Sequence, residues 1–237
     1  MPSNTETARI PEGASGGQRR IPVGKVSWRH TFRALRHRNY RLFFYGQLVS
    51  LIGTWMQSTA MSWLIYQITG SKLLLGVVAA VASAPMMFLS LWGGAVADRY
   101  PKRRIILWAQ TVQMLPAFIL AGLAWTGHAT PLIIIALSTI NGVAMAFDMP
   151  ARQAFTIDMT GKEDLMNAVS LNSSAFHGAR VLGPSLAGLV IGTLGIPFCF
   201  LLNGVSYIAV IIGLLMMRLP EHVPLDEARA AATSAWS

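Results

Sequence analysis

Hydrophobic residues in this chain are gathered into long blocks and do not alternate with polar ones. Six blocks are visible, at residues 43–67, 74–97, 104–126, 131–149, 168–193 and 197–218. Each is close to the roughly 20 residues that a helix needs to cross a bilayer. The strands of a membrane β-barrel would be about 10 residues long, with apolar and polar positions alternating. The pattern therefore predicts an all-α integral membrane protein, a bundle of six transmembrane helices surrounded by lipid.

Polar and charged sequence flanks the predicted six-span domain, which covers residues 43–218. Residues 1–28 are rich in Gly, Ser, Pro and charge, which predicts a disordered N-terminus. In residues 29–42 apolar positions stand among arginines, which predicts a short amphipathic helix lying on the membrane surface. Residues 219–237 are predicted to be a polar tail without a further span.

The connections between the blocks predict how the helices are joined. Residues 69–71, 126–128 and 195–197 are short turns, which place successive helices antiparallel and side by side. Residues 150–167 are the longest connection, and we expect a loop there because Pro150 suits the end of a helix.

Charge changes the picture because it gives the bundle an orientation. Charged residues make up only 12% of the chain and the mean hydropathy is +0.48, yet the net charge is +9. Most cations precede the first block, lie in residues 98–104, or follow the fourth and sixth blocks, whereas the other three connections hold only Lys72. Basic residues stay on the cytoplasmic side of a bilayer, so both termini are predicted to be cytoplasmic. A basic arm beside a membrane is attracted to anionic lipid, so we predict a lipid partner and no nucleic acid.

Arg180 stands out because it lies near the middle of the fifth block. An ionised arginine at that depth costs about 2.5–3.5 kcal/mol on insertion scales. His177 is one turn before it, so a polar stripe is expected on that helix. Two interpretations stay open: a substrate-anion or proton-linked site, or an arginine neutralised by Asp148 or by helix carbonyls. Likewise His177 is either a proton relay or a hydrogen-bonded packing residue. Further polar candidates for a central cavity or for helix bridging are Gln47, Gln57, Gln110, Gln113 and Asn141.

Prolines and small residues predict how the helices deform and pack. Pro85, Pro116 and Pro184 lie inside blocks, and each kinks its helix and frees a backbone carbonyl. Several kinked helices are typical of transporters, although helix packing alone is an alternative explanation. Small residues four positions apart let backbones approach closely in lipid, which predicts contacts at the pairs Gly183 with Ala187 and Gly188 with Gly192.

The sequence contains no pattern that favours an enzyme. The glycines before Lys25 and Lys162 lack the spacing of a phosphate-binding loop. The five histidines have no metal-ligand spacing. The run Gly183-Pro184-Ser185 follows no strand, so it is not a nucleophile elbow. We therefore predict no enzymatic activity, no bound metal and no cofactor.

Three motifs resemble those of the major facilitator superfamily. Residues 94–104 resemble its signature turn between helices two and three, with Pro101 in place of the usual glycine; the matching residues are Gly94, Asp98, Arg99, Lys102, Arg103 and Arg104. Residues 179–188 resemble its antiporter motif at Gly183, Pro184 and Gly188, with alanines in place of two glycines. Residues 38–44 and 146–153 are similar to the bacterial multidrug and enterobactin exporter branch.

The resemblance covers about residues 30–220 and implies one six-helix half of a transporter in the bacterial inner membrane. It implies a three-plus-three inverted repeat, a proton-driven alternation between two halves, and export of drugs, siderophores or other small amphipathic compounds. Asp98 and the basic residues after it would hold the inner gate against the other half. Residues 219–237 fall in what resembles the central loop, so we expect either a half that pairs with a second six-helix half or a truncated product. The alternative is a membrane structural or assembly partner without transport.

Overall fold

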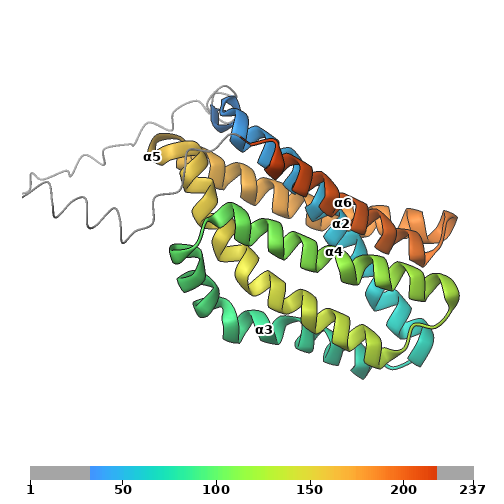
Figure 1. Cartoon of the computed structure of the whole chain (residues 1–237). Helices are drawn as coiled ribbons and strands as arrows, with labels where there is room; N and C mark the ends of the chain where they lie inside the picture. Colours follow the sequence, from blue (N-terminus) through green and yellow to red (C-terminus); the bar gives the residue numbers. More distant parts are fainter. Residues whose placement is uncertain (1–32, 218–237) are drawn as a thin grey trace, which may run out of the picture.

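The computed structural model describes residues 33–217, which form helices joined by short turns (Figure 1). The elements are η1 (Arg33–Arg36), α2 (Arg38–Thr69), α3 (Lys72–Arg99), α4 (Lys102–Thr126), α5 (Pro131–Thr193) and α6 (Ile196–Leu215). Residues 33–217 contain no strand, which confirms the predicted all-α class. The predicted disordered N-terminus and polar tail lie outside the described residues.

The turns between the helices contain glycines that end one helix and hydroxyl side chains that cap the next. α2 ends at Gly70 and α4 ends at Gly127, and both glycines take the left-handed conformation, with φ of 63° and 74°. Glycine adopts this conformation without steric cost. Ser71 and Thr130 then cap α3 and α5 by accepting hydrogen bonds from backbone N–H groups of the first turn.

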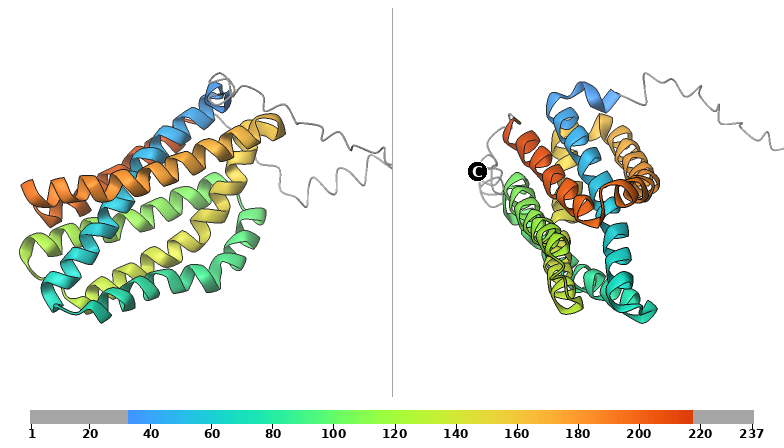
Figure 2. Two further views of the ribbon diagram at one scale, coloured as in Figure 1. Left: turned by 180° about the vertical axis from the view of Figure 1, so that it is seen from behind. Right: turned by 90° about the vertical axis from the view of Figure 1, so that its right-hand side faces the viewer.

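α5 is two helices joined at a sharp bend. Gly161 has φ 69° and ψ 176°, so the chain reverses there and two limbs, residues 131–161 and 162–193, run in opposite directions (Figures 1 and 2). The predicted loop at 150–167 is therefore wrong, because the first limb stays helical through Pro150. A proline inside a helix frees the carbonyl four residues earlier. That carbonyl, of Ala146, lies against the backbone of Gly93 in α3.

Six helical segments match the six predicted spans once α5 is divided. Four are long and apolar enough to cross a membrane: Lys72–Arg99, Lys102–Thr126, Pro131–Gly161 and Ile196–Leu215. α2 and the second limb of α5 are as long but carry more polar residues, so they fall outside this set. Polar side chains inside membrane helices face the bundle or a water-filled cavity. These two helices, together with the first limb of α5, line the polar pocket described below.

Successive helices are antiparallel as predicted, but α2 with α3, α3 with α4 and α5 with α6 make few contacts, so that among successive helices only α4 and α5 pack closely. α3 packs chiefly against α5, and α4 packs against α5 and α6. The α3–α5 contact is close because glycine on each helix meets backbone on the other: Gly93 contacts Ala146, and Gly142 contacts Ala82. α3 and α4 consequently splay apart although a single short turn joins them.

The predicted glycine contacts on the second limb of α5 are only partly correct. A side chain at Gly183 would overlap Trp55 and the backbone of Ile52 in α2, so this glycine does allow a close approach. Gly188 and Gly192 have open space around them and make no such contact. The motif gives the spacing of small residues, but the rotation of the limb decides which of them meets a neighbour.

Most of the described cations gather at one end of the bundle. The turn between α3 and α4, the bend of α5, η1 and the last turn of α6 all lie at that end, whereas the other three connections lie at the opposite end (Figure 1). Arg33, Arg36, Arg38, Arg41, Arg99, Lys102, Arg103 and Arg104 are at the first end, and Lys72 is at the second. Which end faces the cytoplasm stays a prediction from the charge pattern.

Candidate functional site

A polar pocket of about 180 Å³ opens among α2, both limbs of α5, α4 and α6. Its wall combines three aromatic rings, Phe43, Phe44 and Phe176, with a larger set of polar side chains. The polar set is Gln47, Ser50, Thr54, Gln113, Asp148, Arg152, Gln153, Thr156, Asn172 and Tyr207. Apolar walls with a few converging polar groups are typical of small-molecule binding sites.

Asp148 and Arg152 form a buried ion pair at the centre of the polar wall. Asp148 is 4% exposed, and its Oδ2 atom accepts hydrogen bonds from Arg152 Nε at 2.7 Å and Nη2 at 2.6 Å. Gln110 and Gln113 of α4 each donate to the same oxygen at 3.3 Å. A buried charge is stable only when it is paired and hydrogen-bonded. The two residues are four apart on one helix, so the helix itself brings the charges together.

Several polar atoms of this group have no protein partner. Asp148 Oδ1, Arg152 Nη1, Gln110 Oε1 and Gln47 Oε1 are buried and make no hydrogen bond to any described residue. Buried unpaired polar atoms are rare in folded proteins, and each requires an explanation. Three of these four residues, Gln47, Asp148 and Arg152, line the pocket, whereas Gln110 lies outside its lining. The pocket residues therefore carry hydrogen-bonding groups that no described residue satisfies.

Of the alternatives that the sequence leaves open for Arg180, pairing with Asp148 does not occur. Asp148 is already bound by Arg152, which lies on its own helix. Arg180 is exposed on the second limb of α5, where its guanidinium carbon lies 5.6 Å from the centre of the Trp55 ring, a cation–π contact. His177 is also exposed, with its ring edge against Phe176. The sequence gives the depth of Arg180 in the helix but not the direction in which it points.

The other predicted cavity residues separate into two groups. Gln57 is buried and accepts a hydrogen bond from Asn203 Nδ2 at 2.8 Å, so it bridges α2 and α6. Asn141 is half-buried and lies outside the pocket wall. Arg152 was missed as a site residue because Pro150 suggested a loop. The spacing Asp148-x-x-x-Arg152 is the signal that would have found it.

The signature turn, residues 94–104, connects α3 and α4 to the rest of the charged end. Lys102 Nζ lies 2.8 Å from Asp158 Oδ2 on the first limb of α5, and Arg103 donates to the carbonyl oxygen of Leu215 at 3.1 Å. The Lys102–Asp158 pair is partly exposed, so its contribution to stability is small. Asp98 and Arg99 are exposed and make no ion pair or side-chain hydrogen bond with the described residues. Gly94 has open space around it.

A cluster centred on Asp164 joins the start of α2 to the bend of α5. Asp164 is 3% exposed and is approached by Arg33 at 3.0 Å, His37 at 2.9 Å and Arg36 at 3.4 Å. Over residues 33–42, the described part of the predicted amphipathic helix at 29–42, the chain forms the 3-10 turn η1 and the first turn of α2. The reason is that these residues wrap onto Asp164 rather than extending along a surface.

The Asp164 cluster gives a testable dependence on pH. The hydrogen bond from His37 and the charges of Arg33 and Arg36 hold the pKa of Asp164 below its usual value. A carboxylate with a lowered folded-state pKa stabilises the fold above its unfolded pKa, about 4, and loses this contribution as pH falls through the folded value. We expect the melting temperature of the wild type in detergent to fall more steeply than that of Asp164→Asn from about pH 5 to pH 3. Parallel curves for the two proteins would contradict this assignment.

Comparison with known proteins identifies the class. Residues 29–235 match the family model described as a transmembrane secretion effector. The fold is a six-helix half of the kind built by transporters of the major facilitator superfamily. The chain belongs to the transmembrane secretion effector family within that superfamily, is similar to proteins of its siderophore and multidrug exporter branch, and is a multi-pass protein of the bacterial inner membrane.

Three curated relatives describe this branch. The staphyloferrin A transporter of Staphylococcus aureus (strain NCTC 8325 / PS 47) is 29% identical over 80% of this chain and 48% of its own length. The enterobactin exporter EntS of Shigella boydii serotype 4 (strain Sb227) is 25% identical over 87% of this chain and 50% of its own length. The multidrug efflux pump Tap of Mycolicibacterium fortuitum is 26% identical over 65% of this chain and 39% of its own length. The chain thus spans about half the length of the curated relatives it matches.

Proposed function

We propose that this chain is one half of a secondary exporter for siderophores, drugs or other small amphipathic compounds. The observation that carries the proposal is the polar pocket, in which the Asp148–Arg152 pair is enclosed by aromatic rings within a membrane-spanning bundle. Charged residues inside membrane bundles commonly mark substrate or ion pathways. The printed functions of the relatives, siderophore and multidrug export, support the same substrate range.

An amphipathic substrate is proposed because both aromatic and polar side chains line the pocket. Phe44 and Phe176 offer flat apolar surfaces, whereas Gln47 of α2 offers an amide group whose oxygen no described residue binds. A compound with both apolar rings and polar groups would satisfy both. Aromatic surfaces bind such rings with little geometric selectivity, which suits a broad or bulky substrate.

We propose proton coupling through Asp148. Among the described residues it is the acidic side chain that lines the polar pocket, and its carboxylate is contacted by Arg152 and two glutamine amides. Protonation of Asp148 would remove its charge and release Arg152 for a different partner, such as an anionic group of the substrate. A buried pair that can exchange partners in this way links proton binding to a change in the pocket.

A second six-helix half is the proposed partner. Along α3 a row of large apolar side chains is exposed, with Leu91 at 83% and Met87 at 78%. The second limb of α5 also exposes Val181, at 70%. Asp98 stands near this surface without a described partner, where it could hold the gate against a second half.

Replacing Asp98 tests the role of the signature turn. We expect Asp98→Asn to lower proton-driven export at least severalfold in an assembly that transports, because the proposed gate loses a charge across the interface. Asp158→Asn is the matched control, since Asp158 lies at the same end and is paired within this chain. The measurement is the initial rate of dye export from energised membrane vesicles. Wild-type rates in Asp98→Asn would remove the gate assignment.

The direct test of the proposed function is export by the chain itself. Membrane vesicles containing this chain alone would be loaded with a fluorescent amphipathic dye, energised, and compared with vesicles that also contain a separately expressed second half of a relative. Export that stops on addition of an uncoupler supports the proposal. Absence of export in both preparations, with the chain correctly inserted, would favour the structural or assembly role instead.

A further inference from the structure

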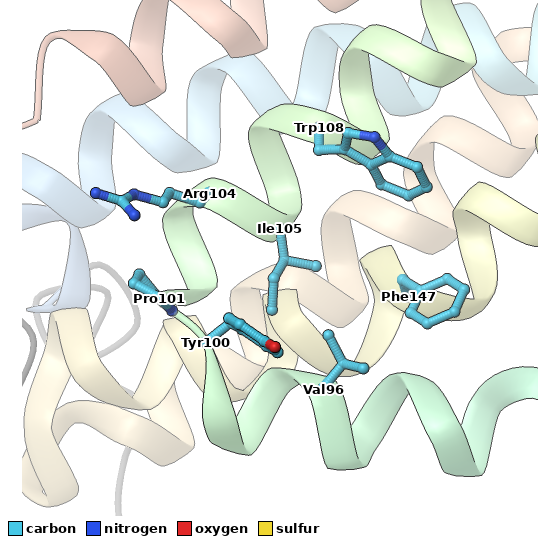
Figure 3. Close-up of a pocket in the computed structure, with 7 residues that line it drawn as sticks. All are labelled: Val96, Tyr100, Pro101, Arg104, Ile105, Trp108 and Phe147. Atoms are coloured by element: carbon cyan, nitrogen blue, oxygen red, sulfur yellow. The ribbon is translucent and has the colours of Figure 1, made fainter. Parts of the chain in front are cut away.

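A second cavity, distinct from the polar pocket, lies between the splayed ends of α3 and α4. This outer groove has a volume of about 340 Å³ and is lined by Val96, Tyr100, Pro101, Arg104, Ile105, Trp108 and Phe147 (Figure 3). It shares no lining residue with the polar pocket. The groove exists because α3 and α4 pack mainly on other helices, which leaves Phe147 of α5 at its inner side.

The floor and the rim of the outer groove differ in chemistry. Val96, Ile105 and Phe147 form an apolar floor, and Figure 3 shows the Arg104 guanidinium extending away from that floor. Tyr100 and Trp108 are 60% and 52% exposed, so two aromatic rings border the groove. Aromatic residues with a polar edge are enriched at the membrane–water interface, and arginines extend to the headgroups from helix ends.

Arg104 is the cation of this groove that has no protein partner. Its neighbours Lys102 and Arg103 are held by Asp158 and by the carbonyl of Leu215. Arg104 is exposed and makes no ion pair or side-chain hydrogen bond within residues 33–217. A free guanidinium above an apolar groove, at the charged end of a membrane bundle, is complementary to a phosphate group above an acyl chain.

We propose that the outer groove binds one anionic phospholipid of the leaflet on this side of the bundle. The acyl chain lies along Val96, Ile105 and Phe147, and the phosphate accepts hydrogen bonds from Arg104. The Tyr100 hydroxyl, which makes no side-chain hydrogen bond to the described residues, is a second donor to the headgroup. The bound lipid also fills the space between the ends of α3 and α4, beside the signature turn.

Trp108 provides a spectroscopic reporter inside the groove. The full chain would be reconstituted with phosphatidylglycerol or phosphatidylcholine carrying brominated acyl chains, which quench nearby tryptophans. The part of the quenching due to Trp108 is the difference between the wild type and Trp108→Phe. Trp125→Phe is the matched control, because Trp125 is on the same helix, is 63% exposed and lies near the opposite end. We expect Trp108 to show about a fivefold preference for phosphatidylglycerol, and Trp125 to show none.

Substitution of the cation completes the test. Arg104→Gln should abolish the preference at Trp108, and Arg104→Lys should retain most of it. Arg41→Gln, which removes an exposed cation of α2 at the same end, should leave it unchanged. Equal quenching by the two lipids in the wild type, or a preference that survives Arg104→Gln, would overturn the proposal. Failure of both lipids to quench Trp108 would also overturn it, since the groove would then be filled by protein.

Discussion

Asp148→Asn and Arg152→Gln are each expected to destabilise the protein by about 3–5 kcal/mol, because each leaves the other charge buried without its partner. Asp148 is 4% exposed and its pair with Arg152 spans 2.6 Å, so each charge depends mainly on the other for compensation. The measurement is the thermal midpoint of the purified chain in detergent, together with its abundance in the membrane.

The double variant Asp148→Asn/Arg152→Gln separates stability from function. Two neutral amides can hydrogen-bond to each other and to the glutamines of α4, so stability should return to within about 1 kcal/mol of the wild type. Export should still be reduced tenfold or more, on the order of the effect of losing an ionised group in a binding site. Asp158→Asn, which breaks a partly exposed pair, should cost less than about 1 kcal/mol. Full export by the stable double variant would show that the pair has only a structural role.

Gly93→Ala is expected to be the most damaging small substitution on α3. The new methyl group would overlap the carbonyl oxygen of Ala146, which Pro150 leaves free of its helical hydrogen bond. Because the obstacle is backbone, α3 and α5 must separate, at a cost of about 1–3 kcal/mol. Gly94→Ala is the matched control, since nothing lies within 4 Å of its added carbon.

The two neighbouring glycines should therefore behave in opposite ways. Gly94→Ala should be neutral or slightly stabilising, because alanine favours a helix by about 1 kcal/mol over glycine. Thermal midpoints and membrane abundance of the two variants, measured side by side, provide the comparison. Equal behaviour of the two variants would contradict the packing of α3 on α5.

The architecture could be predicted from the sequence to the level of its helices. Six apolar blocks predicted six membrane-length helices, and the charge pattern predicted that the basic ends gather together, as Arg33, Arg99 and Arg104 do. Hydropathy predicts the number and length of the helices because any segment that crosses lipid must be a long apolar helix, regardless of how it packs on its neighbours. The bend at Gly161 shows what the sequence pattern does not predict. Pro150 carries a helix-end signal and so predicts a loop. In the structure the helix continues through Pro150, and the Ala146 carbonyl that this proline frees lies against Gly93.

The candidate site was harder to predict because it depends on the rotation of each helix. Arg180 and Asp148 are both polar positions in apolar blocks, yet one is exposed and the other is buried beside Arg152. Gly94 belongs to the recognised motif, but Gly93 is the glycine that packs. Which of two adjacent residues faces a neighbouring helix depends on the rotation of each helix about its axis. The neighbouring helices determine that rotation, and a single sequence does not reveal it.

α2 borders a polar pocket within the membrane-spanning bundle, and cysteine labelling tests this arrangement most directly. Cys199, the single cysteine of the chain, is buried and supplies the unlabelled background. Gln47→Cys places a thiol on the pocket wall, and Val49→Cys places one two residues further on, nearly opposite on the helix. The reagent is a membrane-impermeant maleimide added on the side of the signature turn. The structure predicts rapid labelling at position 47, slowed by an exported dye, and little labelling at position 49. Equal labelling at the two positions, or an unreactive position 47, would contradict the account.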